Sequence, residues 1–424
     1  MKNRLSVVML VLAMLLAGCA GRSTSADDGL GAGDTVAMKY ASLLKMVRYD
    51  SCTVVTIDNP WKEGAVLHRY VLVEKDAPLP HSLPSGTVVR TPVEKAVVFT
   101  SAHCQLMEWL GATEQLAGVA DLKYILVDYV KEGVHQGRIA DCGDGMAPLI
   151  EKIIQIKPDA LWISPFENSG GYGRLENINI PIVECADYME CSAMARAEWM
   201  RFYGLLLGKS READSLFAVV DSSYLALKRL AASGAERTSG AALASGAAQA
   251  SGAERTSGAA RTSGADQASG TAQTSGTEQT SGEGRRSMIT EKLTGGTWYV
   301  PGGASSVGQL IADANGDYAW SDDKHGGSLA MTFETVLAKA GGSDVWIFNY
   351  FGSGELTYER LASEYQGYRQ MKAFKERNVW YVDTQRVPYF EEVSFRPDYL
   401  LRDYIILLHP ELGIGSTRYY RRVM

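Results

Sequence analysis

A Ser-Gly dipeptide recurs every six residues between 233 and 282, and this repeat removes a long stretch of the chain from any folded core. The residues between the dipeptides are small or polar, and Leu243 is the one large apolar residue among them. Such a segment cannot bury enough apolar surface to offset the conformational entropy lost on folding. We therefore predict a disordered insertion over 233–286, so that the fold is built from the chain on either side.

On both sides of the insertion, short apolar segments alternate with segments of helical periodicity. Strand and helix in alternation predict parallel sheets that are covered by helices on both faces. Strands are predicted at 95–100, 124–129, 160–164 and 180–184 before the insertion, and at 297–300, 345–349 and 379–382 after it. Helices are predicted at 104–110, 149–156, 307–314, 332–340 and 367–376.

A longer helix is predicted at 209–232, directly before the insertion. Ser210 suits the N-cap position, Glu212 and Asp214 lie in the first turn, and apolar residues recur at helical spacing as far as Leu227. This helix links the two parts of the chain in which strands and helices alternate.

The N-terminus has the plan of an export signal. Lys2 and Arg4 precede an apolar run at 5–16 that is too short to span a bilayer comfortably. The sequence Leu-Ala-Gly-Cys at 16–19 resembles the bacterial lipobox, in which Cys19 is acylated and becomes the new N-terminus. We expect a lipoprotein of the bacterial cell envelope, anchored at a periplasmic or extracytoplasmic face, whose contact with the membrane is the lipid alone.

The predicted fold class is α/β, with two Rossmann-like lobes joined by a single long helix and interrupted by the disordered insertion. A β-rich segment at 52–91 opens the first lobe. The predicted segments are a signal peptide at 1–18, a flexible tether at 19–50, the N-terminal lobe at 51–208, the interlobe helix at 209–232, the insertion at 233–286 and the C-terminal lobe at 287–424.

Charge and cysteine content exclude some classes of function. The chain has 49 acidic and 42 basic residues, a formal net charge of −7, whereas nucleic-acid binding requires a concentrated basic surface. No cysteine has the CxxC or Cys/His spacing of a zinc site, and pairing in an exported protein is left open. The five cysteines after Cys19 are Cys52, Cys104, Cys142, Cys185 and Cys191.

Two segments, 148–163 and 332–347, share one plan of helix, turn and apolar strand. Each has a glutamate in the first helical turn, Glu151 or Glu334, and an aspartate just before the strand. A glutamate in that position ordinarily interacts favourably with the helix dipole. Its presence at the same place in both halves points to a role that the two lobes share.

The sequences GATEQLAGVADLKYI (111–125), PLIEKIIQIKPDALWIS (148–164) and TFETVLAKAGGSDVWIF (332–348) resemble the class III substrate-binding proteins of ABC importers. That group carries cobalamin, ferric siderophores and haem. The resemblance implies that Glu151 and Glu334 dock onto the paired permease subunits, whose partner ATPase supplies the energy. The chain departs from the family at Gly341 and Gly342, where a proline is common, and this variation does not touch Glu334.

The resemblance also places the ligand between the lobes, where the loops after the strands meet. Many of these loop residues are aromatic, which suits a large, flat, partly apolar ligand such as an iron chelate, haem or cobalamin. Arg386 or Arg396 would meet a carboxylate or phosphate on the ligand. His103 would coordinate haem iron or cobalt, and Tyr172 would coordinate haem iron as a phenolate. We expect no cofactor or metal site of the protein's own. The candidate ligand-binding residues are Ser101, His103, Phe166, Tyr172, Tyr188, Ser305, Tyr318, Tyr350, Arg386 and Tyr389.

Two alternatives remain open. A zinc- or manganese-binding protein of related fold needs about three histidines and a carboxylate in the cleft, but among six histidines only His103 and His325 lie near predicted cleft loops. A haem chelatase-like enzyme is the other, although Ser101 and Cys104 stand without a GxSxG, HExxH or matched Cys/His motif. We predict a binding protein without enzymatic activity, which delivers its ligand to an ABC permease dimer.

Overall fold

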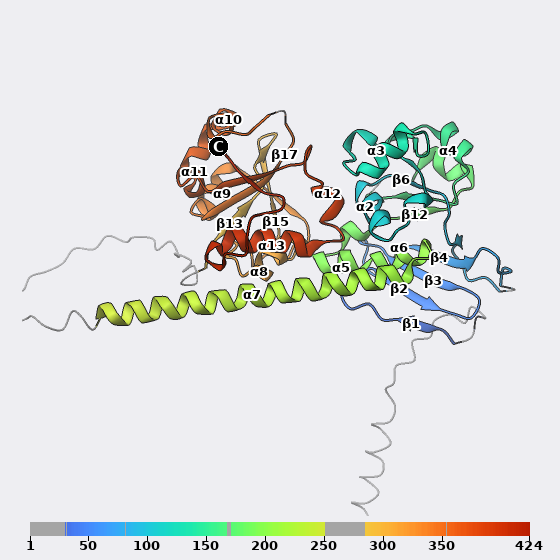
Figure 1. Ribbon diagram of the computed structural model, residues 1–424, viewed down its shortest axis with the longest axis horizontal. Coiled ribbons are helices and arrows are strands. Elements are labelled where there is room, and N and C mark those ends of the chain that lie inside the picture. Colours follow the sequence, from blue (N-terminus) through green and yellow to red (C-terminus); the bar gives the residue numbers. More distant parts are fainter. Residues whose placement is uncertain (1–29, 31, 81, 168–170, 251–284, 353) are drawn as a thin grey trace, which may run out of the picture.

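The computed structural model describes residues 30, 32–80, 82–167, 171–250, 285–352 and 354–424. The predicted signal peptide, Cys19 and the first part of the predicted tether lie outside the described residues, as do 251–284 of the predicted insertion. Two α/β lobes lie side by side above one long helix, α7 (Ser210–Ala250) (Figure 1). This arrangement confirms the predicted fold class.

The first lobe is built on a five-stranded parallel sheet in the order β12-β11-β6-β7-β8. The central strands are apolar throughout and buried, as expected for a sheet with helices on both faces. Its strands are β6 (Ala96–Val98), β7 (Leu116–Val119), β8 (Ala140–Asp141), β11 (Ala160–Ile163) and β12 (Ile182–Glu184), with a short hairpin of β9 (Gly143–Asp144) and β10 (Ala147–Pro148). Its helices are α2 (Ser101–Trp109), α3 (Asp128–His135), α4 (Ile150–Ile156), α5 (Ala193–Glu198) and α6 (Met200–Leu206).

The strand predicted at 124–129 is wrong. Asp121 has a left-handed backbone, so the chain turns after β7, and α3 already begins at Asp128. Ile125 and Val127 are buried because they anchor this connection in the core. They therefore produced an apolar alternation where no strand forms.

A separate five-stranded sheet precedes the first lobe, in the order β1-β2-β3-β4-β5. It corresponds to the β-rich segment predicted at 52–91 but begins earlier, so the predicted flexible tether at 19–50 is too long. The strands are β1 (Asp34–Val36), β2 (Leu44–Arg48), β3 (Thr53–Asp58), β4 (Val66–Glu74) and β5 (Thr87–Thr91).

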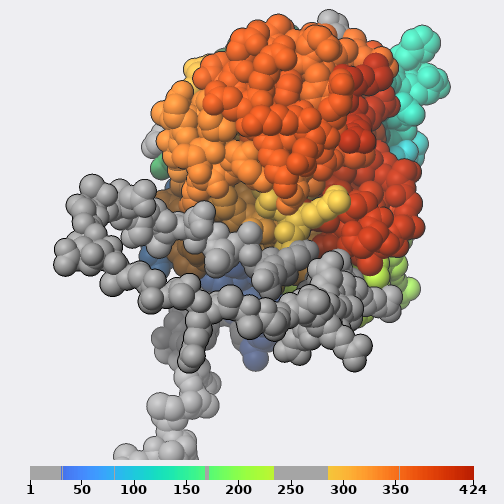
Figure 2. All heavy atoms as spheres, turned by 90° about the vertical axis from the view of Figure 1, so that its left-hand side faces the viewer, coloured from blue at the N-terminus to red at the C-terminus, as the bar shows by residue number. Residues whose placement is uncertain are grey.

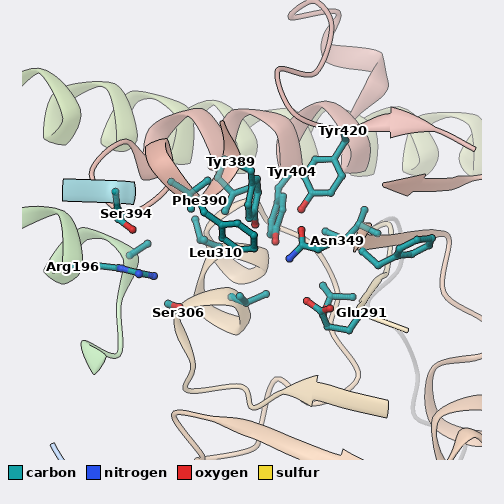
Figure 3. Close-up of a pocket in the computed structure, with 18 of the residues that line it drawn as sticks. Arg196, Glu291, Ser306, Leu310, Asn349, Tyr389, Phe390, Ser394, Tyr404 and Tyr420 are labelled. Carbon is teal, nitrogen blue, oxygen red and sulfur yellow. The ribbon is translucent and has the colours of Figure 1, made fainter. Parts of the chain in front are cut away.

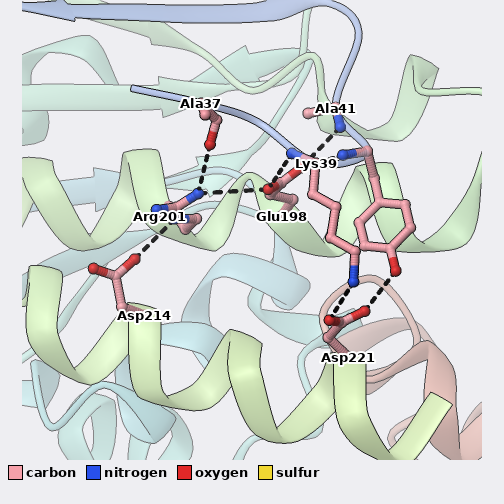
Figure 4. A network of polar contacts seen from close by, with 8 residues as sticks. Ala37, Lys39, Ala41, Glu198, Arg201, Asp214 and Asp221 are labelled. Atoms are coloured by element: carbon pink, nitrogen blue, oxygen red, sulfur yellow. Dashed lines mark hydrogen bonds and ion pairs between the residues drawn. The ribbon is translucent and has the colours of Figure 1, made fainter. Parts of the chain in front are cut away.

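The segment 37–43 between β1 and β2 is fixed by hydrogen bonds to carboxylates from distant parts of the chain (Figure 4). Glu198 is fully buried and accepts hydrogen bonds from the backbone N–H groups of Lys39, Tyr40 and Ala41 at 2.7–2.9 Å. Asp221 of α7 accepts a further bond from Lys39 Nζ at 2.6 Å. These contacts with residues far away in sequence explain why the segment is folded, although it lies within the predicted flexible tether.

Helix α7 (Ser210–Ala250) connects the lobes. Val220 and Tyr224 are buried, and the Tyr224 hydroxyl donates to Asp313 of the second lobe at 2.8 Å. The predicted end at 232 lies inside α7, which continues through the first Ser-Gly repeats because the alanines between them have high helix propensity.

The second lobe contains a four-stranded sheet in the order β13-β17-β18-β19, parallel except for the edge strand β19, and a small antiparallel sheet β14-β15-β16. Figure 2 looks onto this lobe, drawn in orange and red. Its strands are β13 (Met288–Thr290), β14 (Leu293–Thr294), β15 (Thr297–Pro301), β16 (Ser328–Met331), β17 (Val345–Tyr350), β18 (Val379–Asp383) and β19 (Arg421–Arg422). Its helices are α8 (Ser306–Asp313), α9 (Phe333–Ala340), α10 (Tyr358–Glu364), α11 (Lys372–Lys375), α12 (Tyr389–Glu392) and α13 (Pro397–Leu408).

The continuous helix predicted at 367–376 is wrong. A 3₁₀ turn at Gln366–Gln370 precedes α11, and Met371 between them has an extended backbone. Met371 and Tyr368 are both buried, so packing of this pair against the core interrupts the helix.

The lobes share one apolar cluster. Phe395, which follows α12 of the second lobe, packs edge-on against His103 and Tyr203 of the first lobe at centroid distances of 5.4 and 5.9 Å. All five cysteines of the described part are free thiols, and only Cys191 is exposed. No helix in the described ranges combines the length and the apolar character needed to cross a membrane.

Candidate functional site

A cavity of about 310 Å³ lies between the two lobes. The first lobe contributes the start of α2 and the side of α5. The second lobe contributes the carboxyl ends of β13 and β17, the start of α8, and the helices α12 and α13. The cavity therefore lies where open α/β sheets ordinarily bind ligands, at the carboxyl ends of their strands.

Aromatic side chains form one wall of the cavity, with Tyr389, Phe390 and Tyr404 grouped together (Figure 3). The Phe390 side chain is largely exposed, whereas Tyr389 and Tyr404 are buried. Burial raises the pKa of both phenols, so they stay neutral at physiological pH. This wall offers flat apolar surface together with neutral hydroxyl groups.

Arg196 of α5 is the cation of the site and reaches the cavity from the side of the first lobe (Figure 3). Its Nε atom is buried, has no hydrogen-bond partner among the described residues, and lies 3.5 Å from Asp187 Oδ2. The other oxygen of Asp187 accepts a hydrogen bond from the Tyr203 hydroxyl at 2.8 Å and lies 3.2 Å from His103 Nε2. Asp187 thus holds Arg196 at the edge of the cavity.

The charge on Asp187 is maintained although the group is buried. Burial by itself would raise its pKa, but the interactions with His103, Arg196 and Tyr203 outweigh that effect and lower the pKa below the ordinary value. The guanidinium of Arg196 therefore has a permanent anionic partner behind it and hydrogen-bonding capacity left for a ligand.

On the side of the second lobe, Glu291 follows β13 with a left-handed backbone, φ 65°. Burial raises the pKa of its carboxyl group. The neighbouring Thr290 Oγ1 is buried and has no hydrogen-bond partner among the residues described. Thr290 Oγ1 therefore has hydrogen-bonding capacity left for a ligand.

Of the sequence-predicted ligand residues, Ser101 and Tyr389 line this cavity. His103 lies in the first turn of α2 but is only 2% exposed, and Trp162, Tyr203 and Phe395 surround its ring. Burial therefore keeps its imidazole from reaching a ligand in the cavity.

Three further predicted residues have local structural contacts and lie outside the cavity. Ser305 caps α8 by accepting from Gly308 N at 3.1 Å, and the Tyr318 hydroxyl donates to Pro301 O at 2.5 Å. Tyr350 is 4% exposed and packs against Tyr381.

The four remaining predicted residues also lie outside the interlobe cavity. Phe166 and Tyr172 line a hollow of about 630 Å³ on the first lobe, which meets the interlobe cavity at Thr100. The Tyr188 hydroxyl donates to Pro165 O, and Arg386 is exposed with its Nε 3.3 Å from Asp383.

The sequence analysis missed Arg196, Glu291, Tyr404 and Tyr420, all of which line the cavity. The sequence does contain an indication for two of these residues. Arg196 stands alone between alanines in the helix after β12, and Glu291 comes directly after a buried strand. Tyr404 and Tyr420 were indistinguishable from ordinary core aromatics.

The two glutamates expected to dock occupy equivalent positions. Glu151 lies in the first turn of α4 and Glu334 in the first turn of α9, and both are exposed. Glu151 Oε1 lies 3.0 Å from Arg174 Nη2, a pair in which both side chains are largely exposed. Each helix is followed by the second strand of its sheet, β11 or β17.

Residues 97–258 match the family model described as periplasmic binding protein. The petrobactin-binding protein YclQ of Bacillus subtilis superposes with a TM-score of 0.51 at 16% identity, covering 83% of this chain and 98% of that one. Two uncharacterized lipoproteins of Methanocaldococcus jannaschii are 21% and 22% identical, covering 91% and 99% of this chain and 85% and 98% of their own lengths. Over residues 97–258 the chain is therefore similar to periplasmic binding proteins, and its fold resembles that of a solved member of that group.

Proposed function

We propose that this protein is the lipid-anchored substrate-binding component of an ABC importer and that it captures a ferric siderophore between its lobes. The observation that carries the proposal is the composition of the interlobe cavity, in which Arg196 faces a wall of neutral aromatics. Ferric siderophores combine an apolar framework with anionic oxygen donors, so such a cavity matches both parts. The likeness to a petrobactin-binding protein in fold agrees with this assignment.

The cavity favours a siderophore over haem because a siderophore already fills the coordination sphere of its iron. Haem ordinarily gains an axial protein ligand. The His103 side chain is buried in the core, and burial keeps the phenols of Tyr389 and Tyr404 neutral. Neither group is arranged to coordinate a metal in the cavity.

Capture would involve only a modest movement of the lobes. The continuous helix α7 and the packing of Phe395 against the first lobe both resist a wide opening. Delivery would follow through Glu151 and Glu334, since exposed charges on rigid helices set the orientation of an encounter and accelerate it.

The test is a titration of the chain from residue 20 onward with ferric hydroxamates, ferric catecholates, ferric citrate, haem and cobalamin. Eight tryptophans make fluorescence quenching a sensitive measurement. We expect submicromolar binding of one ferric siderophore class, and at least tenfold weaker binding by Arg196→Met. Arg229→Met, which changes an exposed arginine of α7, serves as the matched control.

Haem binding with a shifted Soret band, or no response to the whole panel from folded protein, would contradict the siderophore assignment. Equal losses of affinity in Arg196→Met and Arg229→Met would show that Arg196 does not contact the ligand.

A further inference from the structure

A second cavity, of about 430 Å³, lies at the seam between the leading sheet and the first lobe. The leading sheet contributes Trp61, His68 and Thr87, and the lobe contributes Tyr172 and Glu184 among others. The volume falls within the usual range of small-molecule sites. The seam cavity shares none of its described lining residues with the interlobe cavity proposed to bind the siderophore.

Glu184, the last residue of β12, is the central feature of the seam cavity. It is only 8% exposed, and its Oε1 accepts a hydrogen bond from the Tyr172 hydroxyl at 2.9 Å. Its Oε2 is buried and has no hydrogen-bond partner within the described part of the chain. A buried carboxylate oxygen without a partner is costly, so structures ordinarily satisfy it with a bound group.

His68 is the nearest basic side chain, but it does not satisfy this oxygen. Its Nδ1 lies 3.7 Å from Glu184 Oε2, beyond hydrogen-bond distance, and its Nε2 is engaged with Thr87 Oγ1 at 2.8 Å. The ring stacks on Tyr70 at a centroid distance of 4.4 Å, and burial lowers the pKa of the imidazole, so it is mostly neutral at pH 7.5. The described residues that line the seam cavity therefore provide no cationic group to pair with the Glu184 carboxylate.

The rest of the lining is also suited to a positive charge. Glu176 adds a second carboxylate, and among the described lining residues there is no lysine or arginine. Trp61, Phe166 and Tyr172 supply aromatic rings at the same cavity. Aromatic faces beside a desolvated carboxylate are the usual surroundings of a bound organic cation.

We propose that the seam cavity binds a small organic cation, an alkylammonium or alkylguanidinium, whose head donates to Glu184 Oε2 while its alkyl part packs on Trp61 and Phe166. Convergence of three or more histidine, cysteine or acidic side chains, as a metal ion would need, does not occur among the described residues. This site is separate from the siderophore cavity, and its ligand contains no iron.

The experiment titrates the chain from residue 20 onward, at pH 7.5, with n-butylamine and n-butylguanidine, using calorimetry and the shift in melting temperature. The neutral isostere 1-butanol is the ligand control. We expect saturable binding of at least one cation, a higher melting temperature in its presence, and no response to 1-butanol. Comparison of the two cations distinguishes an ammonium site from a guanidinium site.

Glu184→Gln is the decisive variant because it removes the charge and keeps the shape of the side chain. We expect it to weaken cation binding at least tenfold while its own melting temperature stays equal or rises, since an unpaired buried charge is lost. Glu114→Gln, an exposed acid that does not line the seam, is the matched control and should bind like the wild type.

Absence of saturable binding, equal binding of 1-butanol, or unchanged affinity in Glu184→Gln would overturn the proposal. None of these outcomes bears on the titration with ferric siderophores, so the two proposals fail independently. Trp61→Leu provides a second check, because loss of the ring should weaken the cations without affecting siderophore binding.

Discussion

At the scale of single residues, Asp187 links the apolar core of the first lobe to the interlobe cavity. Its carboxylate contacts His103 and Tyr203 on the core side and Arg196 on the cavity side. The charge persists in a buried position because these partners lower the pKa more than burial raises it. Asp187 is therefore a positioning residue for Arg196.

Asp187→Asn should destabilise the protein by about 3 kcal/mol at pH 7, because Arg196 loses its buried anionic partner. Since the pKa of Asp187 is lowered on folding, its contribution is complete above the ordinary value of 3.8 and declines as the pH falls through the lower folded value. Urea denaturation of both proteins between pH 7 and pH 3 measures the difference. As a control, Tyr203→Phe should lower the free energy of unfolding by about 1 kcal/mol with little dependence on pH. A loss of stability in Asp187→Asn that does not change with pH would contradict this account.

At the scale of elements, the two lobes use the same helix-turn-strand unit with the same connection to a neighbouring strand. Asp159, just before β11, accepts from the backbone N–H groups of Glu94 and Lys95 at the start of β6. Asp344, just before β17, accepts from the N–H and hydroxyl of Ser287 at the start of β13. In each lobe the aspartate fixes the start of the parallel strand beside its own.

Asp159→Ala and Asp344→Ala should each destabilise the protein by about 1–3 kcal/mol, because backbone donors at a strand start lose their acceptor. Burial alone would raise the pKa of both carboxyls, but a lysine and the donors at the neighbouring strand lower it. The stability that each ionised aspartate contributes is therefore present above about pH 4 and is lost as the pH falls below that value.

The measurement is urea denaturation of both single variants and of the double variant. Because the two sites lie in different lobes, the losses should add. A clearly non-additive double variant, or a loss from only one lobe, would show that the two units are not equivalent.

At the scale of the whole molecule, the two lobes present Glu151 and Glu334 from equivalent helices on a body held together by α7 and the apolar contact of Phe395. A permease built from two similar subunits would meet one acidic group on each lobe. Docking is therefore expected to depend on both lobes together rather than on one surface patch.

Glu151→Arg combined with Glu334→Arg should abolish binding to the cognate permease and transport, while the ligand affinity and melting temperature stay unchanged. Ligand affinity and melting temperature should not change because both side chains are exposed and lie outside the interlobe cavity. Pull-down with the permease in detergent and uptake in cells measure the effect. Glu63→Arg combined with Glu376→Arg gives the same change of net charge on other exposed acids, so a similar loss in that variant would refute specific docking.

The sequence by itself determined the alternation of strands and helices and the architecture of two lobes and a helix, because apolar periodicity and capping are local properties. It also determined that Glu151 and Glu334 share one position, since each lies in a recognisable helix-turn-strand unit. It misjudged the segment at 124–129 and the start of the folded chain, where Ile125 and the backbone at 39–41 depend on partners far away in sequence.

Only the tertiary structure decided which side chains form the sites. Arg196, Glu291 and Tyr404 meet at one cavity although they come from three elements and two lobes. His103 looked suitable for a ligand, but the packing of Phe395 across the lobes buries it. Burial, unpaired donors and acceptors, and contacts between lobes arise only when distant segments pack together, so local periodicity does not encode them.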